Sequence, residues 1–131
     1  MKRLCGVLVA FVVMITVCGC AQTSINKNTD ISLTFIYEEE NITVTLEDDE
    51  AEKVIAILNG NHYDPISYGH PSCGFDKNIS LKVDGRSYAI ARDACNRIQD
   101  LGNLRYFDIS IENMEYIHSL FEKYGGYFPC V

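Results

Sequence analysis

The residues best suited to chemistry in this chain lie in one connecting segment, residues 61–74, with the sequence NHYDPISYGHPSCG. Histidine, aspartate and cysteine are residue types that bind zinc. The candidate metal set consists of His62, Asp64, His70 and Cys73. The spacing contains neither a His-x3-His pair nor a Cys-x2-Cys pair, and two prolines are more typical of an ordered loop. A metal site and an ordered binding loop therefore both remain open as interpretations.

The same segment carries the side chains that we expect to contact a ligand. Connections longer than about 12 residues in compact domains are often functional or disordered. Aromatic residues and prolines favour an ordered connection here. The expected ligand contacts are Tyr63, Tyr68, His70 and Phe75.

The first twenty residues carry an export signal. Met1-Lys2-Arg3 is positively charged and residues 4–17 are almost wholly apolar, as in a secretory signal. Val17-Cys18-Gly19-Cys20 then resembles the lipobox of bacterial lipoproteins. The resemblance covers only these residues. It implies a covalent lipid on Cys20 and a domain anchored in the cell membrane that faces outside the cytoplasm or into the periplasm. We expect no other cofactor.

An uncleaved membrane anchor is the alternative interpretation of this N-terminus, because residues 4–21 carry no charge. Cleavage instead removes a signal peptide, residues 1–19, that contains Lys2 and Arg3 but no acidic residue. The formal net charge then changes from −7 to −9, which is unsuited to nucleic-acid binding. The length allows a single core, so we assign residues 20–30 to a lipidated cysteine with a polar tether and residues 31–131 to one domain.

Three cysteines remain in the domain, and an oxidising compartment favours a disulfide between two of them. If the hairpin around Asp84-Gly85 continues, Cys73 lies opposite position 96. This register favours Cys73–Cys95, provided that a bulge corrects the alternation of side chains. A bond between Cys73 and Cys130 is the alternative. A third cysteine, Cys130 in the favoured scheme, is either a buried small side chain or a reactive thiol.

Alternating apolar and polar residues predict two β-hairpins that position these groups. In the first, residues 31–46, a loop at residues 38–41 pairs Tyr37 with Ile42. In the second, residues 75–91, Asp84-Gly85 is a preferred two-residue turn. A short strand near Ile98 and another over residues 104–109 follow.

Two stretches with helical periodicity complete the domain. The first is residues 49–59, where Asp48 or Asp49 caps the helix and Glu52 closes a capping box. The second is residues 111–124, which follow the N-cap Ser110. The order predicts an α+β fold: an antiparallel sheet of two hairpins plus one or two further strands, with both helices packed on one face.

No known catalytic motif accompanies this fold. The nucleophile elbow, phosphate-binding loop, dinucleotide fingerprint and zinc-protease motif are absent from the sequence. Residues 38–52 contain eight acidic residues and no basic one, which we interpret as a solvated surface that can attract a basic partner. We therefore expect a lipid-anchored envelope module that is not an enzyme and that binds a protein or a small ligand. The alternative is a small envelope metal-binding or thiol–disulfide protein that uses residues 62–73.

Overall fold

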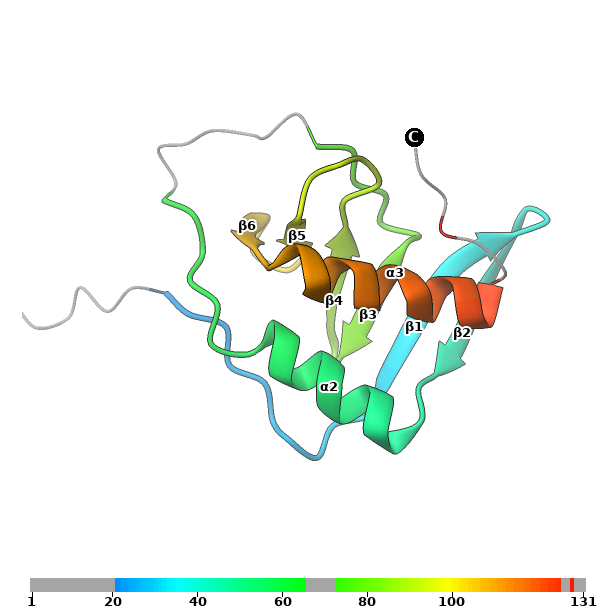
Figure 1. Ribbon diagram of the computed structural model, residues 1–131, viewed down its shortest axis with the longest axis horizontal. Helices are drawn as coiled ribbons and strands as arrows, with labels where there is room; N and C mark the ends of the chain where they lie inside the picture. The colour runs from blue at the N-terminus through cyan, green and yellow to red at the C-terminus, as the bar shows by residue number, and fades with distance from the viewer. Residues whose placement is uncertain (1–20, 66–72, 126–127, 129–131) are drawn as a thin grey trace, which may run out of the picture.

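The computed structural model of the protein describes residues 21–65, 73–125 and 128. They form a six-stranded antiparallel sheet and two helices, which confirms the predicted α+β class (Figure 1). The elements in chain order are β1 (Ile31–Tyr37), β2 (Glu40–Thr45), α2 (Asp48–Leu58), β3 (Ser80–Val83), β4 (Arg86–Ile90), β5 (Arg97–Asp100), β6 (Arg105–Asp108) and α3 (Ile111–Gly125). The four strands between the helices correspond to the larger of the two numbers that the sequence predicts.

The strands lie in the spatial order β2-β1-β3-β4-β5-β6, so β2 and β6 form the two edges. One face of the sheet packs against both helices, and their apolar side chains share a single core. The largest fully buried side chains from the sheet are Ile31, Leu33, Leu81, Val83, Tyr88, Ile90, Ile98 and Phe107. Positions of the opposite parity, such as Ser32, Lys82 and Gln99, project from the other face.

The register of the first hairpin differs from the prediction by two residues. Tyr37 pairs with Glu40 and Phe35 with Ile42, so the loop is Glu38-Glu39 alone. Both glutamates have positive φ, 48° and 69°, as a type I′ turn requires. The predicted four-residue loop is wrong because a type I′ turn usually contains Asn-Gly, Asp-Gly or Gly-Gly, and Glu-Glu does not indicate such a turn. A shift of two residues keeps every side chain on its predicted face, so the inward pattern survived the error.

The second hairpin has the predicted turn and pairing. Val83 pairs with Arg86 and Leu81 with Tyr88 across Asp84-Gly85. The predicted start at residue 75 is wrong, because β3 begins at Ser80. Asp76 closes a turn before it: its side chain accepts a hydrogen bond from the Asn78 amide at 2.8 Å.

The predicted capping box of α2 is also wrong by a few residues. The N-cap is Glu47, whose amide donates to the Glu50 carboxylate at 3.3 Å. Glu50 is turned inward because Lys123 and the Tyr124 hydroxyl of α3 bind it at 2.8 Å and 2.5 Å. Burial raises the pKa of the Glu50 carboxyl, but these hydrogen bonds outweigh it and lower the pKa below its usual value. The predicted cap of α3 is confirmed, since Ser110 accepts from the Asn113 amide.

The residues assigned to a tether are partly folded into the domain. The Ala21 carbonyl accepts from the Tyr63 amide at 3.3 Å, and the Thr23 hydroxyl donates to the Leu58 carbonyl at 2.6 Å. Thr23 and Ile25 are buried. The C-terminal carbonyls of a helix need partners, and Thr23 supplies one to α2. Residues 21–25 therefore pack on the domain that was predicted to start at residue 31. Within the described residues, neither helix combines the length and apolar character needed to cross a membrane.

Candidate functional site

Residues 61–65, the first part of the predicted binding loop, run along the edge of β6. The Asp64 amide donates to the Tyr106 carbonyl at 2.7 Å, and Arg105 donates to the Asp64 carbonyl at 2.8 Å. The Asp64 carboxylate lies 3.3 Å from the guanidinium of Arg97, which also binds Asp108. This segment thus covers a strand edge, and Asp64 has a structural partner.

Tyr63, a predicted ligand contact, points to the helix-covered side of the sheet. Its ring meets that of Phe107 edge-on at 5.8 Å, and the Arg105 guanidinium lies 5.0 Å from the ring centre. Its hydroxyl donates to the carboxylate of Asp100 at 2.5 Å. Burial, reinforced by this bond, raises the pKa of Tyr63 to about 12. The hydroxyl therefore stays protonated and holds Asp100 in place.

Tyr63 and Asp100 line a cleft of about 430 Å³. The other lining residues come from the N-terminal segment, from the start of β4 and from the β5–β6 turn: Gln22, Arg86, Gly102 and Asn103. Asp100 is only 3% exposed, and the Gly102 amide donates to its other oxygen at 2.9 Å. Two donors therefore balance the carboxylate from within the fold.

The cleft also contains an exposed cation. Arg86 is exposed and forms no ion pair with any residue that the structure describes. Tyr88, directly opposite Asp100 in the sheet, is fully buried. Its hydroxyl interacts with the side chain of Arg86, two residues earlier on the same face of β4. Burial raises the pKa of Tyr88, so the hydroxyl remains a donor.

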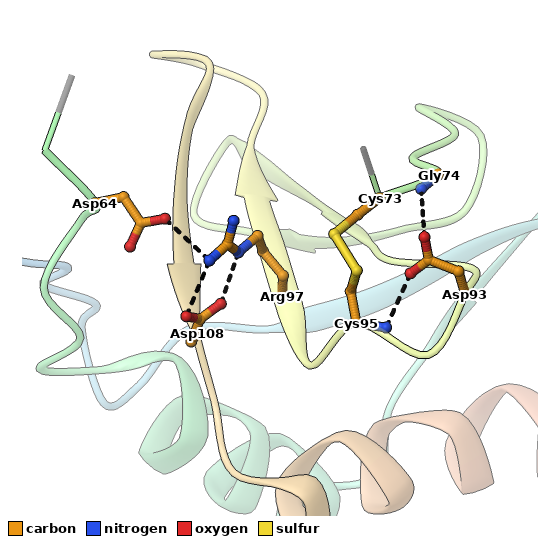
Figure 2. Close-up of a disulfide and its surroundings, with 7 residues drawn as sticks. All are labelled: Asp64, Cys73, Gly74, Asp93, Cys95, Arg97 and Asp108. Atoms are coloured by element: carbon orange, nitrogen blue, oxygen red, sulfur yellow. Dashed lines mark hydrogen bonds and ion pairs between the residues drawn. A yellow bond between two sulfur atoms is a disulfide. The ribbon is translucent and has the colours of Figure 1, made fainter. Parts of the chain in front are cut away.

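A disulfide between Cys73 and Cys95 lies on the way from the binding loop to β3, as Figure 2 shows. Their Cα atoms are 6.1 Å apart, and the bond is the favoured one of the two predicted pairings. The expected bulge is absent: Cys95 lies in the loop between β4 and β5, outside the ladder. Asp93 closes this loop, because its carboxylate accepts from the amides of Gly74 and Cys95 at 3.0 Å and 2.9 Å.

The predicted metal set is not gathered in the described part of the chain. His62 pairs with Gln22 in an isolated bridge, Asp64 binds Arg97, and Cys73 is bonded to Cys95. The fourth member, His70, lies outside the described residues. A different group, Cys73, Asp93 and Cys95, has its donor atoms within 4.8 Å of one another. Metal binding there requires free thiolates, which the disulfide removes.

The other predicted site residues lie away from the cleft or outside the described residues. The ring of Phe75 packs against Tyr106, 5.5 Å from centre to centre, away from the cleft. Tyr68, Cys20 and Cys130 lie outside the described residues. Sequence reasoning missed Arg86 and Asp100, although both occupy inward positions of strands in which such positions are apolar. A charged residue at an inward strand position is the signal that would have identified them.

Comparison of the chain with protein-family models, with curated protein sequences and with solved structures yields no match. The fold and the site therefore define the class: an α+β domain with a six-stranded antiparallel sheet, a disulfide and a polar cleft beside one sheet edge.

Proposed function

We propose that the chain is a lipid-anchored binding module of a bacterial cell envelope. Its cleft binds a small ligand that carries a carboxylate or a similar planar oxyanion. The observation that carries this proposal is the exposed Arg86 guanidinium, which lines the cleft and forms no ion pair with any described residue. The volume of about 430 Å³ is within the range of small-molecule sites.

The charges of the cleft favour an anionic group. Asp100 is buried and receives two hydrogen bonds, so its charge is directed into the fold. Arg86 is the exposed charge, and its planar fork matches two oxygens of a carboxylate.

Binding without catalysis is supported by the residues that line the cleft. They include no serine, cysteine or histidine that could act as nucleophile or general base. The carboxylate of Asp100 already accepts from Tyr63 and Gly102. Nothing in the cleft thus corresponds to the nucleophile and base of acyl transfer, whereas oriented hydrogen-bond donors suit recognition.

The test is an NMR titration of the protein with acetate and with succinate at constant ionic strength. We expect shifts at Arg86, Tyr63 and Asn103, and about tenfold weaker binding in Arg86→Gln, which corresponds to roughly 1.4 kcal/mol. Lys82→Gln is the matched control, because Lys82 is an exposed cation on the other face of the same sheet. Equal weakening by both substitutions would show that the anions respond only to net charge.

The lipid anchor has its own test, since it rests on the N-terminal resemblance alone. A membrane-fraction assay with a fatty-acid probe should label the wild-type chain and not Cys20→Ser. Labelling of Cys20→Ser would exclude Cys20 as the lipidated residue and would leave the proposal for the cleft unaffected.

The thiol or metal alternative is favoured by one observation, the three donors of Cys73, Asp93 and Cys95. Metal analysis and a free-thiol count separate it from the binding module. The binding module predicts one disulfide and no bound transition metal, whereas one equivalent of zinc or copper in the purified protein would favour the alternative.

A further inference from the structure

We infer that the outer edge of β2 is a docking site for an extended, basic segment of a partner protein, which adds to the sheet as a further strand. Strand addition uses backbone groups that an edge leaves unpaired. The inference is independent of the cleft, which lies beside the opposite edge of the sheet.

The hairpin turn determines which backbone groups of β2 face outward. A two-residue turn is closed by a hydrogen-bonded pair, here Tyr37 and Glu40, and such pairs then alternate along the ladder. The bond from the Leu46 amide to the Ile31 carbonyl at 2.8 Å continues this alternation. The backbone groups of Asn41, Thr43 and Thr45 therefore point away from β1, and no described residue donates a backbone hydrogen bond to them or accepts one from them.

The β2 edge has few of the usual devices that prevent strand addition, and Glu40 is its one charged residue. It contains no proline and no lysine, and it pairs with β1 without a bulge. The alternation of side chains also defines its partner. Ile42 and Val44 lie on the helix side, whereas Thr43 and Thr45 lie on the polar face. An added strand with alternating apolar and polar residues would continue both faces.

Charge identifies the kind of partner. The neutral stretch Asn41–Thr45 has Glu38, Glu39 and Glu40 at one end and Glu47, Asp48 and Asp49 at the other. A strand with lysine or arginine at both ends is complementary to this arrangement. A second copy of the chain is not, because pairing two β2 strands in either direction places acidic ends beside acidic ends.

The test uses a synthetic peptide, Lys-Lys-Thr-Val-Thr-Val-Thr-Lys-Lys, and a counterpart with glutamate in place of lysine. Amide hydrogen exchange of the full mature protein is measured with each. We expect the basic peptide to slow exchange of the Asn41, Thr43 and Thr45 amides by at least about tenfold, with little change at Ile42 and Val44. Higher salt should weaken this protection, and the acidic peptide should give none.

Two pairs of variants decide the outcome. Thr43→Pro removes an outward amide and should abolish protection, whereas Thr43→Val retains the amide and should keep it. Glu40→Gln with Asp48→Asn should weaken binding several-fold, whereas Glu112→Gln with Glu115→Gln, on α3, should not. The second pair keeps the inference testable if Thr43→Pro fails to fold. Absence of protection at millimolar basic peptide, equal binding of the acidic peptide, or protection by self-association would overturn it.

Discussion

The two edges of the sheet are built in opposite ways. At β6, residues 61–65 contribute a backbone bond to Tyr106, an ion pair to Arg97 and the Tyr63 hydroxyl to Asp100. At β2, the outward groups of Asn41, Thr43 and Thr45 receive no backbone hydrogen bond from the described residues. Proteins generally cover or charge their edges to avoid unwanted pairing. The contrast indicates that residues 61–65 cover the β6 edge, whereas the backbone groups of the β2 edge can pair with another strand.

The covered edge is also the one that carries the disulfide and the cleft. Cys73–Cys95 fixes the chain between the 61–65 segment and β3, and the cleft lies beside β5 and the β5–β6 turn. A rigid, internally bonded edge suits a small ligand that needs fixed donors. An edge with free backbone groups suits an extended peptide, because the backbone of the peptide supplies the missing hydrogen-bond donors and acceptors.

Removal of the disulfide should have the largest effect. The bond joins residues 22 positions apart, and closing a loop of this size contributes about 3 kcal/mol to the free energy of unfolding. Cys73→Ser with Cys95→Ser should lose about this amount in urea unfolding. Amide exchange of Asp64 should accelerate more than that of the β1–β2 hairpin. Equal acceleration at both edges would contradict a distinct covered edge.

Tyr63→Phe should have the next largest effect, a loss of about 2 kcal/mol, because the variant removes a hydrogen bond to a buried carboxylate. Tyr37→Phe is the matched control at the open edge. Tyr37 is 47% exposed, and its substitution should change the free energy of unfolding by less than about 0.5 kcal/mol. Similar losses in the two variants, measured by urea unfolding, would argue against the contrast.

Alkaline pH should remove the contribution of Tyr63 to stability. The pKa of Tyr63 is raised to about 12 in the folded protein, so the unfolded chain releases this proton first, near pH 10. The stabilising contribution is complete below pH 10 and is lost as the pH rises toward 12. The wild type should therefore lose more stability over this range than Tyr63→Phe. Unfolding curves measured at several pH values provide the comparison.

Asp64→Asn should have the smallest effect. It removes the half-exposed ion pair with Arg97 but keeps the backbone bonds of residue 64 to Tyr106 and Arg105. Partly exposed pairs contribute about 0–1 kcal/mol, and we expect a loss of about 0.5 kcal/mol. A loss above about 2 kcal/mol would show that charge, rather than backbone pairing, closes the β6 edge.

Local patterns predicted the elements of the fold well, and contacts between distant segments explain most of the errors. Alternation placed Leu33, Phe35 and Val44 on the inward face even though the register was wrong by two. The turn at Glu38-Glu39 requires a positive φ angle at both residues, and glutamate rarely adopts such angles. The sequence therefore predicted a longer loop at this place. The cap of α2 depends on Lys123 and Tyr124, which lie far away in the sequence.

The candidate site was predicted only in part, for a related reason. Tyr63 was predicted as a ligand contact because it lies in a long connecting segment that is rich in aromatic residues. Its partner Asp100 lies 37 residues later, and their contact exists only once β5 lies beside β4. The Cys73–Cys95 disulfide could be predicted from the sequence because the turn at Asp84-Gly85 sets the register of the hairpin that brings the two cysteines near each other. Residues 21–25 looked like a tether because a single buried Ile25 produces no periodic pattern.

If Cys20 carries the proposed lipid, the packing of residues 21–25 would restrict how the domain lies on the membrane. Ala21 is already bonded to Tyr63, so a lipid on Cys20 would be attached one Cα step, about 3.8 Å, from the folded body. A linker this short would leave the domain little freedom to reorient relative to the bilayer. Gln22 also lines the cleft, so the cleft would open close to the lipid headgroups. The β2 edge, five strand spacings or roughly 24 Å across the sheet from β6, would face the surrounding compartment.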